Sequence, residues 1–284
     1  SRDPKSILNE INKLKENGFK EVTLLGQNVD SYLWFGGGLK KDFKKANNIQ
    51  KRTAINFAKL LDLVAKCYPD FRIRFTTSNP QDMDIEVLTT MQSHKNICNH
   101  IHLPVQSGSN KILKAMNRQH TREEYLNLIS NIKKILPNCG ISQDMITGFP
   151  NETEKDHLDT LSLMELVKYD FGFMFKYSER PGTLAARKMK DNISEKVKQR
   201  RLSEIIDLQF KHSYKNLSKY KNKVTEILIE KESKKSTKFW CGRNEQNIMV
   251  VIPKENYVPG DFVEVLVENN TSTTLIGFAK KKIK

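Results

Sequence analysis

The chain has 284 residues, a formal net charge of +15, and 38% hydrophobic and 29% charged residues. Hydrophobic content at this level supports a folded core. No apolar run approaches the roughly 20 residues that span a bilayer, so we expect no membrane partner. The chain starts Ser-Arg-Asp-Pro, without an initiator Met or a signal peptide. We therefore expect a piece of a longer chain, although N-terminal processing or a chosen expression boundary gives the same start.

Helical and strand-like patterns alternate over the first two thirds of the chain. Apolar residues at helical spacing predict helices over residues 4–17, 56–65, 85–91, 121–135 and 153–167. Short apolar and β-branched runs predict strands over residues 21–25, 72–76, 101–103, 140–146 and 171–175. Residues 34–51, rich in Gly and Lys, predict an inserted loop. The alternation indicates an α/β fold of parallel βα units, and five strands are too few for an eight-stranded barrel. We expect a partial barrel that has lost elements upstream.

The last third of the chain has a different pattern. Residues 194–219 predict one long basic helix. Period-two runs then predict five short strands, over residues 224–230, 239–242, 249–252, 262–267 and 273–279. They indicate a small antiparallel β-barrel. We place the domain boundary near Ser218, which gives domains of residues 1–217 and 218–284.

Polar residues follow the predicted parallel strands, where ligands bind in α/β folds. These strand-end residues are Gly26, Gln27, Asn28, Thr77, Ser78, Asn79, Gln106, Ser107, Asp144, Lys176 and Tyr177. Amides and hydroxyls predominate, which suits hydrogen bonding to a nucleoside or an amino acid better than acid–base hydrolysis. Two alternatives stay open: that Gln106 and Ser107 only cap the next helix, and that Lys176 is the ion-pair partner of Asp144.

Candidate metal ligands are few. His100 and His102 face the same side of a strand, but two histidines alone are a weak metal signal, and a structural role fits them better. The four cysteines are scattered at Cys67, Cys98, Cys139 and Cys241, with no CxxC pair. We expect reduced, mostly buried thiols in a cytoplasmic protein.

The excess of positive charge lies mainly in the last third. Residues 180–284 carry 23 Lys and Arg against 12 Asp and Glu, which favours RNA or DNA as a partner, although a solubilising surface explains the charge equally well. Stacking and phosphate contacts fit a group of residues in the predicted barrel, namely Lys231, Lys234, Lys235, Lys238, Phe239, Trp240 and Arg243. For Trp240, a place in the barrel core is the equal alternative.

Several motifs occur together in a recognisable order. They include Leu-Leu-Gly-Gln-Asn-Val at 24–29, Arg-Phe-Thr-Thr-Ser-Asn-Pro at 74–80 and Pro-Val-Gln-Ser-Gly-Ser at 104–109. Asp-Met-Ile-Thr-Gly-Phe-Pro at 144–150 and Tyr-Ser-Glu-Arg-Pro-Gly-Thr at 177–183 follow. The chain therefore resembles the MiaB-type methylthiotransferases, radical S-adenosylmethionine enzymes that modify tRNA. Its last domain resembles TRAM, a small RNA-binding barrel.

The resemblance implies a function and a set of partners. The reaction is 2-methylthiolation of N6-isopentenyl-adenosine at position 37 of tRNA, in which a 5′-deoxyadenosyl radical removes hydrogen from carbon 2. Sister enzymes act on threonylcarbamoyl-adenosine in tRNA or on a ribosomal protein. S-adenosylmethionine is the implied cofactor, with Gly26, Gln27 and Asn28 near its methionine part. Ser78, Gln106, Ser107 and Asp144 lie where the resemblance puts the cofactor and substrate. We also expect a flavodoxin- or ferredoxin-like electron donor and a monomer.

One part of the family pattern is missing from this sequence. The family carries two 4Fe-4S clusters, one held by a CxxxCxxC motif and one by three further cysteines, and the four cysteines here have neither spacing. We therefore expect a fragment that is inactive alone. The alternative from another class is a tRNA-binding module without catalysis. An ordinary barrel hydrolase is disfavoured, because acid–base pairs are missing.

Overall fold

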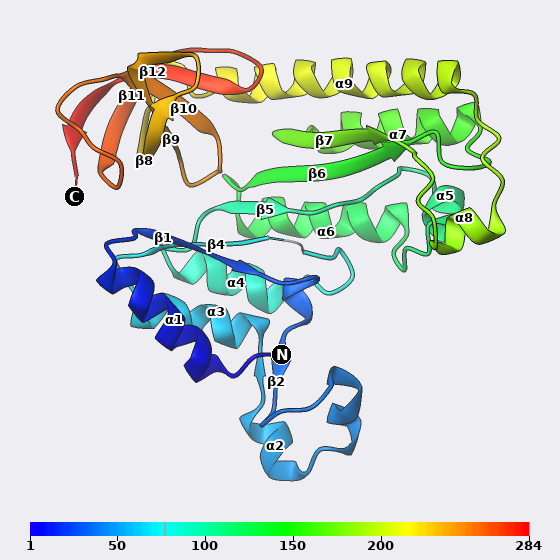
Figure 1. Cartoon of the computed structure of the whole chain (residues 1–284), viewed down its shortest axis with the longest axis horizontal. Helices are drawn as coiled ribbons and strands as arrows, with labels where there is room; N and C mark the ends of the chain where they lie inside the picture. The colour runs from blue at the N-terminus through cyan, green and yellow to red at the C-terminus, as the bar shows by residue number, and fades with distance from the viewer. Residues whose placement is uncertain (77, 284) are drawn as a thin grey trace. The chain divides into compact units, whose positions relative to one another are not determined.

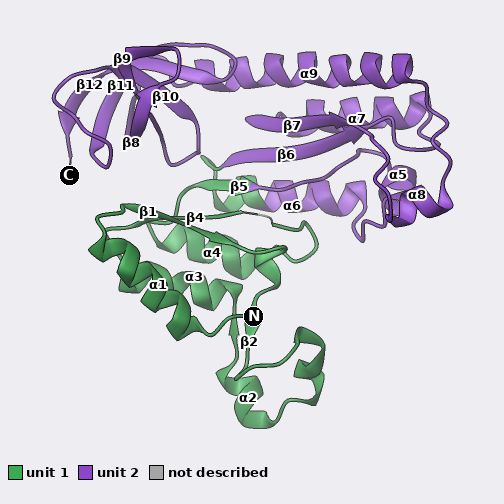
Figure 2. Ribbon diagram, in the orientation of Figure 1, with its two compact units in different colours: residues 1–101, 132–139 green, residues 102–131, 140–284 purple. Residues whose placement is uncertain are grey.

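The structure is a computed structural model that describes residues 1–76 and 78–283 (Figure 1). Thr77, expected at the end of a strand, and Lys284 lie outside the described residues. The chain divides into two compact units, one of residues 1–101 and 132–139 and one of residues 102–131 and 140–284 (Figure 2). Within the part that the structure describes, no helix has the length and apolar character needed to cross a membrane.

The first unit is built on two parallel strands. Strand β1 (Glu21–Leu25) pairs with β4 (Arg72–Thr76) along its whole length. Three helices accompany this pair: α1 (Pro4–Glu16), α3 (Phe57–Cys67) and α4 (Ile85–Ser93). Asp3 begins α1 by accepting a hydrogen bond from the Lys5 amide, and Pro4 follows as the first helical residue. Helices α3 and α4 contact each other, and their apolar stripes are buried.

The segment predicted to be an inserted loop contains short elements of its own. These are η1 (Val29–Ser31), β2 (Leu33–Trp34), η2 (Lys40–Lys45), α2 (Asn48–Thr53) and β3 (Ile55–Asn56). Strands β2 and β3 pair in antiparallel fashion, so the ends of the insertion meet. A capping box between Asn47 and Gln50 begins α2, and this local signal explains why the segment is not simply a loop.

A three-stranded sheet has the order β5 (His100–His102), β6 (Gly140–Thr147) and β7 (Phe171–Lys176), and β6 and β7 belong to the second unit. Strand β6 is parallel to β7, as the alternating pattern predicts. Helices α5 (Asn110–Ala115), α6 (Arg122–Ile135), α7 (Glu154–Val167) and α8 (Leu184–Lys188) connect the strands or follow them. The long helix α9 (Glu195–Ser218) contacts β6, β7 and α7 (Figure 1).

These observations establish a mixed α/β domain, and the partial barrel stays a prediction. Parallel strands of the described residues form two hydrogen-bonded sheets, β1-β4 and β5-β6-β7. An isolated bridge joins Ile73 of β4 to Ile97 ahead of β5. Each parallel pair is connected through helices, as parallel strands require.

Five strands at the C-terminal end close on one another in the order β10-β12-β11-β8-β9. They are β8 (Val224–Ser233), β9 (Ser236–Arg243), β10 (Met249–Pro253), β11 (Phe262–Asn270) and β12 (Thr274–Lys282). The prediction of a wholly antiparallel barrel is wrong for one pair, because β10 and β12 run parallel. The other four pairings are antiparallel. A closed ring with an odd number of strands cannot alternate direction throughout, so one parallel pair is unavoidable.

The core of these five strands also receives a residue from α9. Leu217, in the last turn of the helix, packs among Ile227, Val250, Val265 and other buried side chains of the strands. The helix and the strands therefore share apolar contacts that neither would keep alone.

We expect Leu217→Ala to destabilise the five-stranded barrel by about 2–5 kcal/mol, because the lost side chain leaves a cavity. The measurement is urea unfolding followed by the fluorescence of Trp240, which is buried in the same core, in a Trp34→Phe background. Leu158→Ala, at an exposed leucine of α7, is the control and should change stability by less than about 0.5 kcal/mol. Equal stabilities of the two variants would contradict the shared core.

Candidate functional site

In the first unit, the candidate residues gather around a buried carboxyl group. Asn28 follows β1, and Ser78 follows β4. The Ser78 hydroxyl donates to Asp30 Oδ1 at 3.2 Å, and the Asn79 amide donates to Asp30 Oδ2 at 3.1 Å. Asn28 Nδ2 donates to Asp82 Oδ2 at 2.6 Å. The predicted residues Asn28 and Ser78 are thus each tied to a nearby carboxyl group. Gln27 is exposed, and Gly26 is partly buried.

Asp30 has an unusual proton affinity. Burial raises the pKa of its carboxyl group to about 7, the hydrogen bonds from Ser78 and Asn79 lower that pKa in part, and the charge of Asp82 raises it further. Asn28 Oδ1 is buried and has no hydrogen-bond partner among the described residues. Asp82 already pairs with a cation, because Lys40 Nζ is 3.3 Å from its Oδ1. Asn28 Oδ1 and the Asp30 carboxyl group are the acceptors that suit a cationic amine.

In the second unit, Gln106 and Asp144 lie side by side. The Gln106 amide donates to the Asp144 carbonyl, and the Ile146 amide donates to the Gln106 carbonyl, each at 2.9 Å. Gln106 has a φ of 76°, in the left-handed region that residues other than glycine rarely adopt. Two backbone hydrogen bonds hold it in this conformation, and such strain is typical of functional sites.

Ser107 has a different environment. Its side chain is buried, with Oγ 3.4 Å from Thr160 Oγ1 of α7, and the hydroxyl accepts a hydrogen bond from the Ser109 amide at 3.2 Å. Helix α5 begins after Ser109 with no side-chain capping hydrogen bond, so Ser107 does not cap it, and a ligand contact of Ser107 stays a prediction. Gly108 approaches α7 so closely that a Cβ there would lie 2.4 Å from the Asp159 carbonyl oxygen. The turn after β5 is therefore packed tightly against α7.

Asp144 belongs to the face of the sheet that carries His102. Asp144 Oδ1 is 3.4 Å from His102 Nε2, and His102 Nδ1 is 2.8 Å from Ser142 Oγ. The expectation that Lys176 pairs with Asp144 is wrong, because Lys176 pairs with Glu195 at 2.8 Å. Lys176 is in register with Thr147, not with Asp144, so its side chain is on the opposite face.

Sequence reasoning missed two aromatic residues of this face. Phe173 is in register with Asp144, and Phe175 with Ile146, so these side chains share one side of the sheet. The two phenylalanines are 54% and 52% exposed, and the Phe173 ring lies edge-on to His102 at a centroid distance of 6.1 Å. The alternation Phe-Gly-Phe-Met-Phe is the sequence signal from which they could have been found. An open face with aromatic rings beside Asp144 and His102 suits a flat polar ligand such as a nucleobase.

The turn that follows β6 is anchored to α9. Glu152 accepts from the Gly148 amide at 2.7 Å and from Arg201 at 2.8 Å, and both charged side chains are buried. Gly148 has a φ of 73°, and a Cβ there would lie 2.4 Å from Cγ of Lys198. Lys198 in turn bonds to Asp191 and Glu195. The turn cannot shift without disturbing α9.

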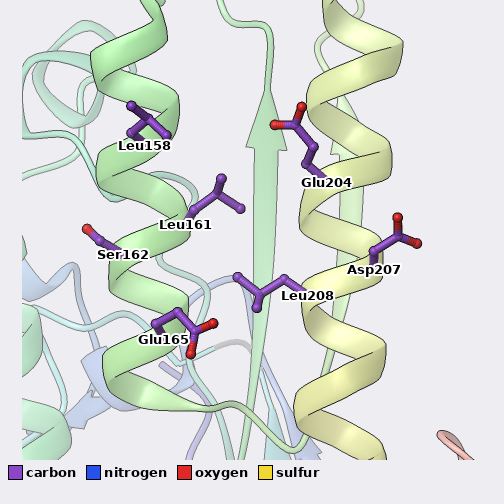
Figure 3. A pocket seen from close by; sticks show the side chains of 7 residues that line it. All are labelled: Leu158, Leu161, Ser162, Glu165, Glu204, Asp207 and Leu208. Atoms are coloured by element: carbon purple, nitrogen blue, oxygen red, sulfur yellow. The ribbon is translucent and has the colours of Figure 1, made fainter.

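A groove of about 690 Å³ lies between α7 and α9 (Figure 3). Its lining residues are Leu158, Leu161, Ser162, Glu165, Glu204, Asp207 and Leu208. Glu204 is 2.6 Å from His157 Nε2, and Glu165 is 3.1 Å from His212 Nε2, so these carboxylates hold the two helices together. None of the candidate residues lines this groove.

The predicted RNA-binding residues differ in their exposure. Lys234, Lys235 and Lys238 are exposed on the β8–β9 hairpin. Arg243 pairs with Glu230 at 2.6 Å. The Trp240 ring belongs to the barrel core at 7% exposure, with Lys254 Nζ 4.4 Å from its centroid, which matches the core alternative. The Trp240 ring therefore has no exposed face on which a base could stack in this structure.

No metal centre forms in the part of the chain that the structure describes. Groups of three or more His, Cys, Asp or Glu side chains that might hold a metal ion do not occur among residues 1–76 and 78–283. Cys98 and Cys241 are buried, Cys139 is intermediate and Cys67 is exposed, contrary to the expectation of burial for Cys67. Thiolates are the ligands of iron–sulfur clusters, so the described residues do not fit such a cluster.

The sequence matches known proteins along most of its length. Residues 1–164 match the model of the Radical SAM superfamily, and residues 218–280 match that of the TRAM domain. The chain is 66% identical over 98% of its length to the tRNA-2-methylthio-N(6)-dimethylallyladenosine synthase of Christiangramia forsetii. It is 62% identical, again over 98% of its length, to the protein of the same name from Flavobacterium psychrophilum. It spans 58% of the length of each of these relatives.

We expect stability to fall as pH rises from about 4 to about 7, because the folded state keeps a proton on Asp30 that the unfolded state releases. Asp30→Asn should remove this part of the pH dependence, which amounts to at most about 4 kcal/mol. The measurement is the urea midpoint of parent and variant at pH 5 and pH 8. Asp207→Asn, at an exposed carboxylate, is the control. Parallel pH profiles of the parent and Asp30→Asn would contradict a protonated Asp30.

Proposed function

The chain belongs to the Radical SAM superfamily, and on that premise we propose that it is part of a tRNA-2-methylthio-N6-dimethylallyladenosine synthase. The reaction adds sulfur and a methyl group to carbon 2 of N6-isopentenyl-adenosine at position 37 of tRNA. The observation that carries this proposal is the 66% identity, over 98% of the chain, to a protein of that name. Residues 1–217 would form most of a catalytic barrel that lacks its first strand, and residues 218–284 would form the TRAM domain.

The polar groups of the first unit suit the methionine part of S-adenosylmethionine. Its methionine part carries a cationic amine, and the acceptors Asn28 Oδ1 and Asp30 supply the complementary environment. We assign Gly26, Gln27, Asn28 and Ser78 to this part, with Gln106, Ser107 and Asp144 contacting the rest of the cofactor or the substrate. When bound, the cofactor supplies the radical and the methyl group for the reaction. A carboxyl group with a raised pKa can give up its proton to solvent as the cationic amine arrives.

The second unit supplies groups that orient the substrate. Asp144 and His102 offer hydrogen bonds, and Phe173 offers an exposed ring on the same face of the sheet. A base that stacks on Phe173 would reach these polar groups with its edge. The turns held by α7 and α9 keep Gln106 and Asp144 fixed while the substrate binds.

The iron–sulfur clusters do not fit the described residues, and we derive no step through them. The family implies a 4Fe-4S cluster, whose ligands must be thiolates. The cysteines of this chain have no CxxxCxxC spacing. We therefore assign the ligands of this cluster, and of a second one, to residues outside this sequence. The isolated chain should then yield no 5′-deoxyadenosine after treatment with iron and sulfide.

The same proposal names the partners and the setting. These are a tRNA substrate, a flavodoxin- or ferredoxin-like electron donor, a monomeric state and a cytoplasmic location. Lys234, Lys235, Lys238 and Arg243 would contribute to tRNA binding, and the exposed lysines of the hairpin support this assignment.

A chimera tests the function directly. Residues 1–284 replace the matching segment of the Christiangramia forsetii protein, and the chimera is expressed in a host that lacks its own 2-methylthio modification. We expect mass spectrometry of digested tRNA to detect 2-methylthio-N6-dimethylallyladenosine. Asp144→Asn in the chimera should lower the modified fraction by about 10-fold or more, since it removes an ionic hydrogen bond to the ligand. Asp207→Asn should leave that fraction unchanged.

The alternatives predict other results from the same chimera. A product derived from threonylcarbamoyl-adenosine, or a modified ribosomal protein, would assign the chain to a sister enzyme. A folded chimera with intact clusters that binds tRNA without modifying it would favour a binding module.

A further inference from the structure

The C-terminal half of α9 exposes two aromatic rings among lysines. Phe210 is 46% exposed and Tyr214 is 53% exposed. They are four residues apart, so they lie on one face of the helix with Lys211 and Lys215, which are also exposed. We call Phe210, Lys211, Tyr214 and Lys215 the α9 strip. The helix is drawn in yellow in Figure 1.

Beyond Asp207, which lies one turn before Lys211, the charge along the chain is of one sign. Residues 208–223 contain five lysines and no Asp or Glu. Within the described residues, none of the five has a carboxylate oxygen within 4.0 Å of its nitrogen. Lys219 hydrogen-bonds to Asn216 Oδ1. Lysines without carboxylate partners leave a positive field that attracts polyanions.

The N-terminal half of the same helix has the opposite character. Lys198 pairs with Asp191 and Glu195, Arg200 with Glu154 and Glu204, and Arg201 with Glu152 and Glu154. These cations have structural partners. Three of the four cations in the first half of α9 thus have carboxylate partners, where the helix anchors the turn after β6. Among the described residues, the lysines of the half that leads to the barrel have none.

Packing of the helix does not need the α9 strip. Gln209 donates to the Tyr169 carbonyl at 2.9 Å, Ser213 donates to the Asp170 carbonyl at 2.6 Å, and Leu217 fills the barrel core. None of these contacts uses a side chain of the α9 strip. Lysines near a helix C-terminus also stabilise its dipole, but that effect gives no reason for exposed aromatic rings.

We propose that the α9 strip is an RNA-binding surface, separate from the β8–β9 hairpin. Phe210 and Tyr214 stack on unpaired bases, and Lys211 and Lys215 contact the neighbouring phosphates. Alternating rings and cations are the chemistry of single-stranded or loop RNA. The identity of that RNA as tRNA rests on the proposed function. Asn270 of β11 donates to the Tyr214 carbonyl at 3.2 Å, which fixes this turn of the helix against the barrel.

Binding of an unmodified tRNA transcript to the 284-residue chain tests the proposal across a series of salt concentrations. Lys211→Ala with Lys215→Ala should weaken binding and lower the salt slope by about 0.7–0.9 per lysine. Phe210→Ala with Tyr214→Ala should weaken binding by about 5- to 100-fold per stacked base while the salt slope stays unchanged. Tyr214→Phe should keep the affinity of the parent, because the ring remains.

The end of α1 supplies matched controls. Lys13 and Lys15 lie in the last turn of that helix, and Phe19 is 56% exposed just beyond it. Lys13→Ala with Lys15→Ala, and separately Phe19→Ala, remove the same groups from another surface and should leave tRNA binding unchanged. Photocrosslinking of RNA that contains 5-iodouridine should label Tyr214 in the parent chain, which tests the contact without any substitution.

Several outcomes overturn the proposal. One is that the double lysine variant, the double aromatic variant and the parent bind tRNA with equal affinity at every salt concentration, and that 5-iodouridine RNA does not crosslink to the α9 strip. Another is displacement of tRNA by polyglutamate as readily as by unlabelled RNA, which would assign the strip to an acidic protein. A parent chain that binds no tRNA also overturns it, whereas modification by the chimera decides the proposed function separately.

Discussion

The buried ion pair between Arg201 and Glu152 is the contact on which the candidate site of the second unit depends. Removing one partner of such a pair leaves a buried charge uncompensated, which typically costs about 3–5 kcal/mol. Glu152 also accepts from the Gly148 amide, so the pair fixes the turn that ends β6. Asp144 lies on that strand, and its carbonyl holds Gln106 in a strained conformation. The positions of both candidate residues therefore depend on a residue of α9.

Local signals in the sequence predicted most elements of the fold. Helix α7, which the capping pair Thr153 and Asp156 begins, covers the predicted range, and β6 and β7 each extend one residue beyond theirs. The parallel pair β10–β12 was not predicted, because it follows from ring closure, which no single strand encodes. The short elements between β2 and β3 were missed for another reason, since Gly and Lys in that segment outweighed the capping signal of Asn47.

The sequence predicted where site residues occur better than it predicted their contacts. Polar residues at strand ends were recognisable because ligands bind there in parallel α/β folds. Asp30 and Asp82 escaped notice, since their effect on Asn28 and Ser78 arises only when distant segments meet. Trp240 is the opposite case, a residue whose predicted contact does not form. Its position among lysines resembles an RNA contact in the sequence, but the fold buries its ring in the barrel core.

Helix α9 fixes both the distance and the rotation about the helix axis between its two anchored ends. It has 24 residues, which corresponds to about 36 Å at 1.5 Å per residue. The ion pair of Arg201 with Glu152 holds its first half, and the packing of Leu217 in the barrel core holds its last turn. Neither end can therefore shift along the helix axis. One residue inserted between them would turn everything downstream by about 100°. An insertion of seven residues, close to two full turns, would preserve that orientation and lengthen the helix by about 10 Å. Evolution can therefore change the length of this helix far more easily in steps of two turns than one residue at a time.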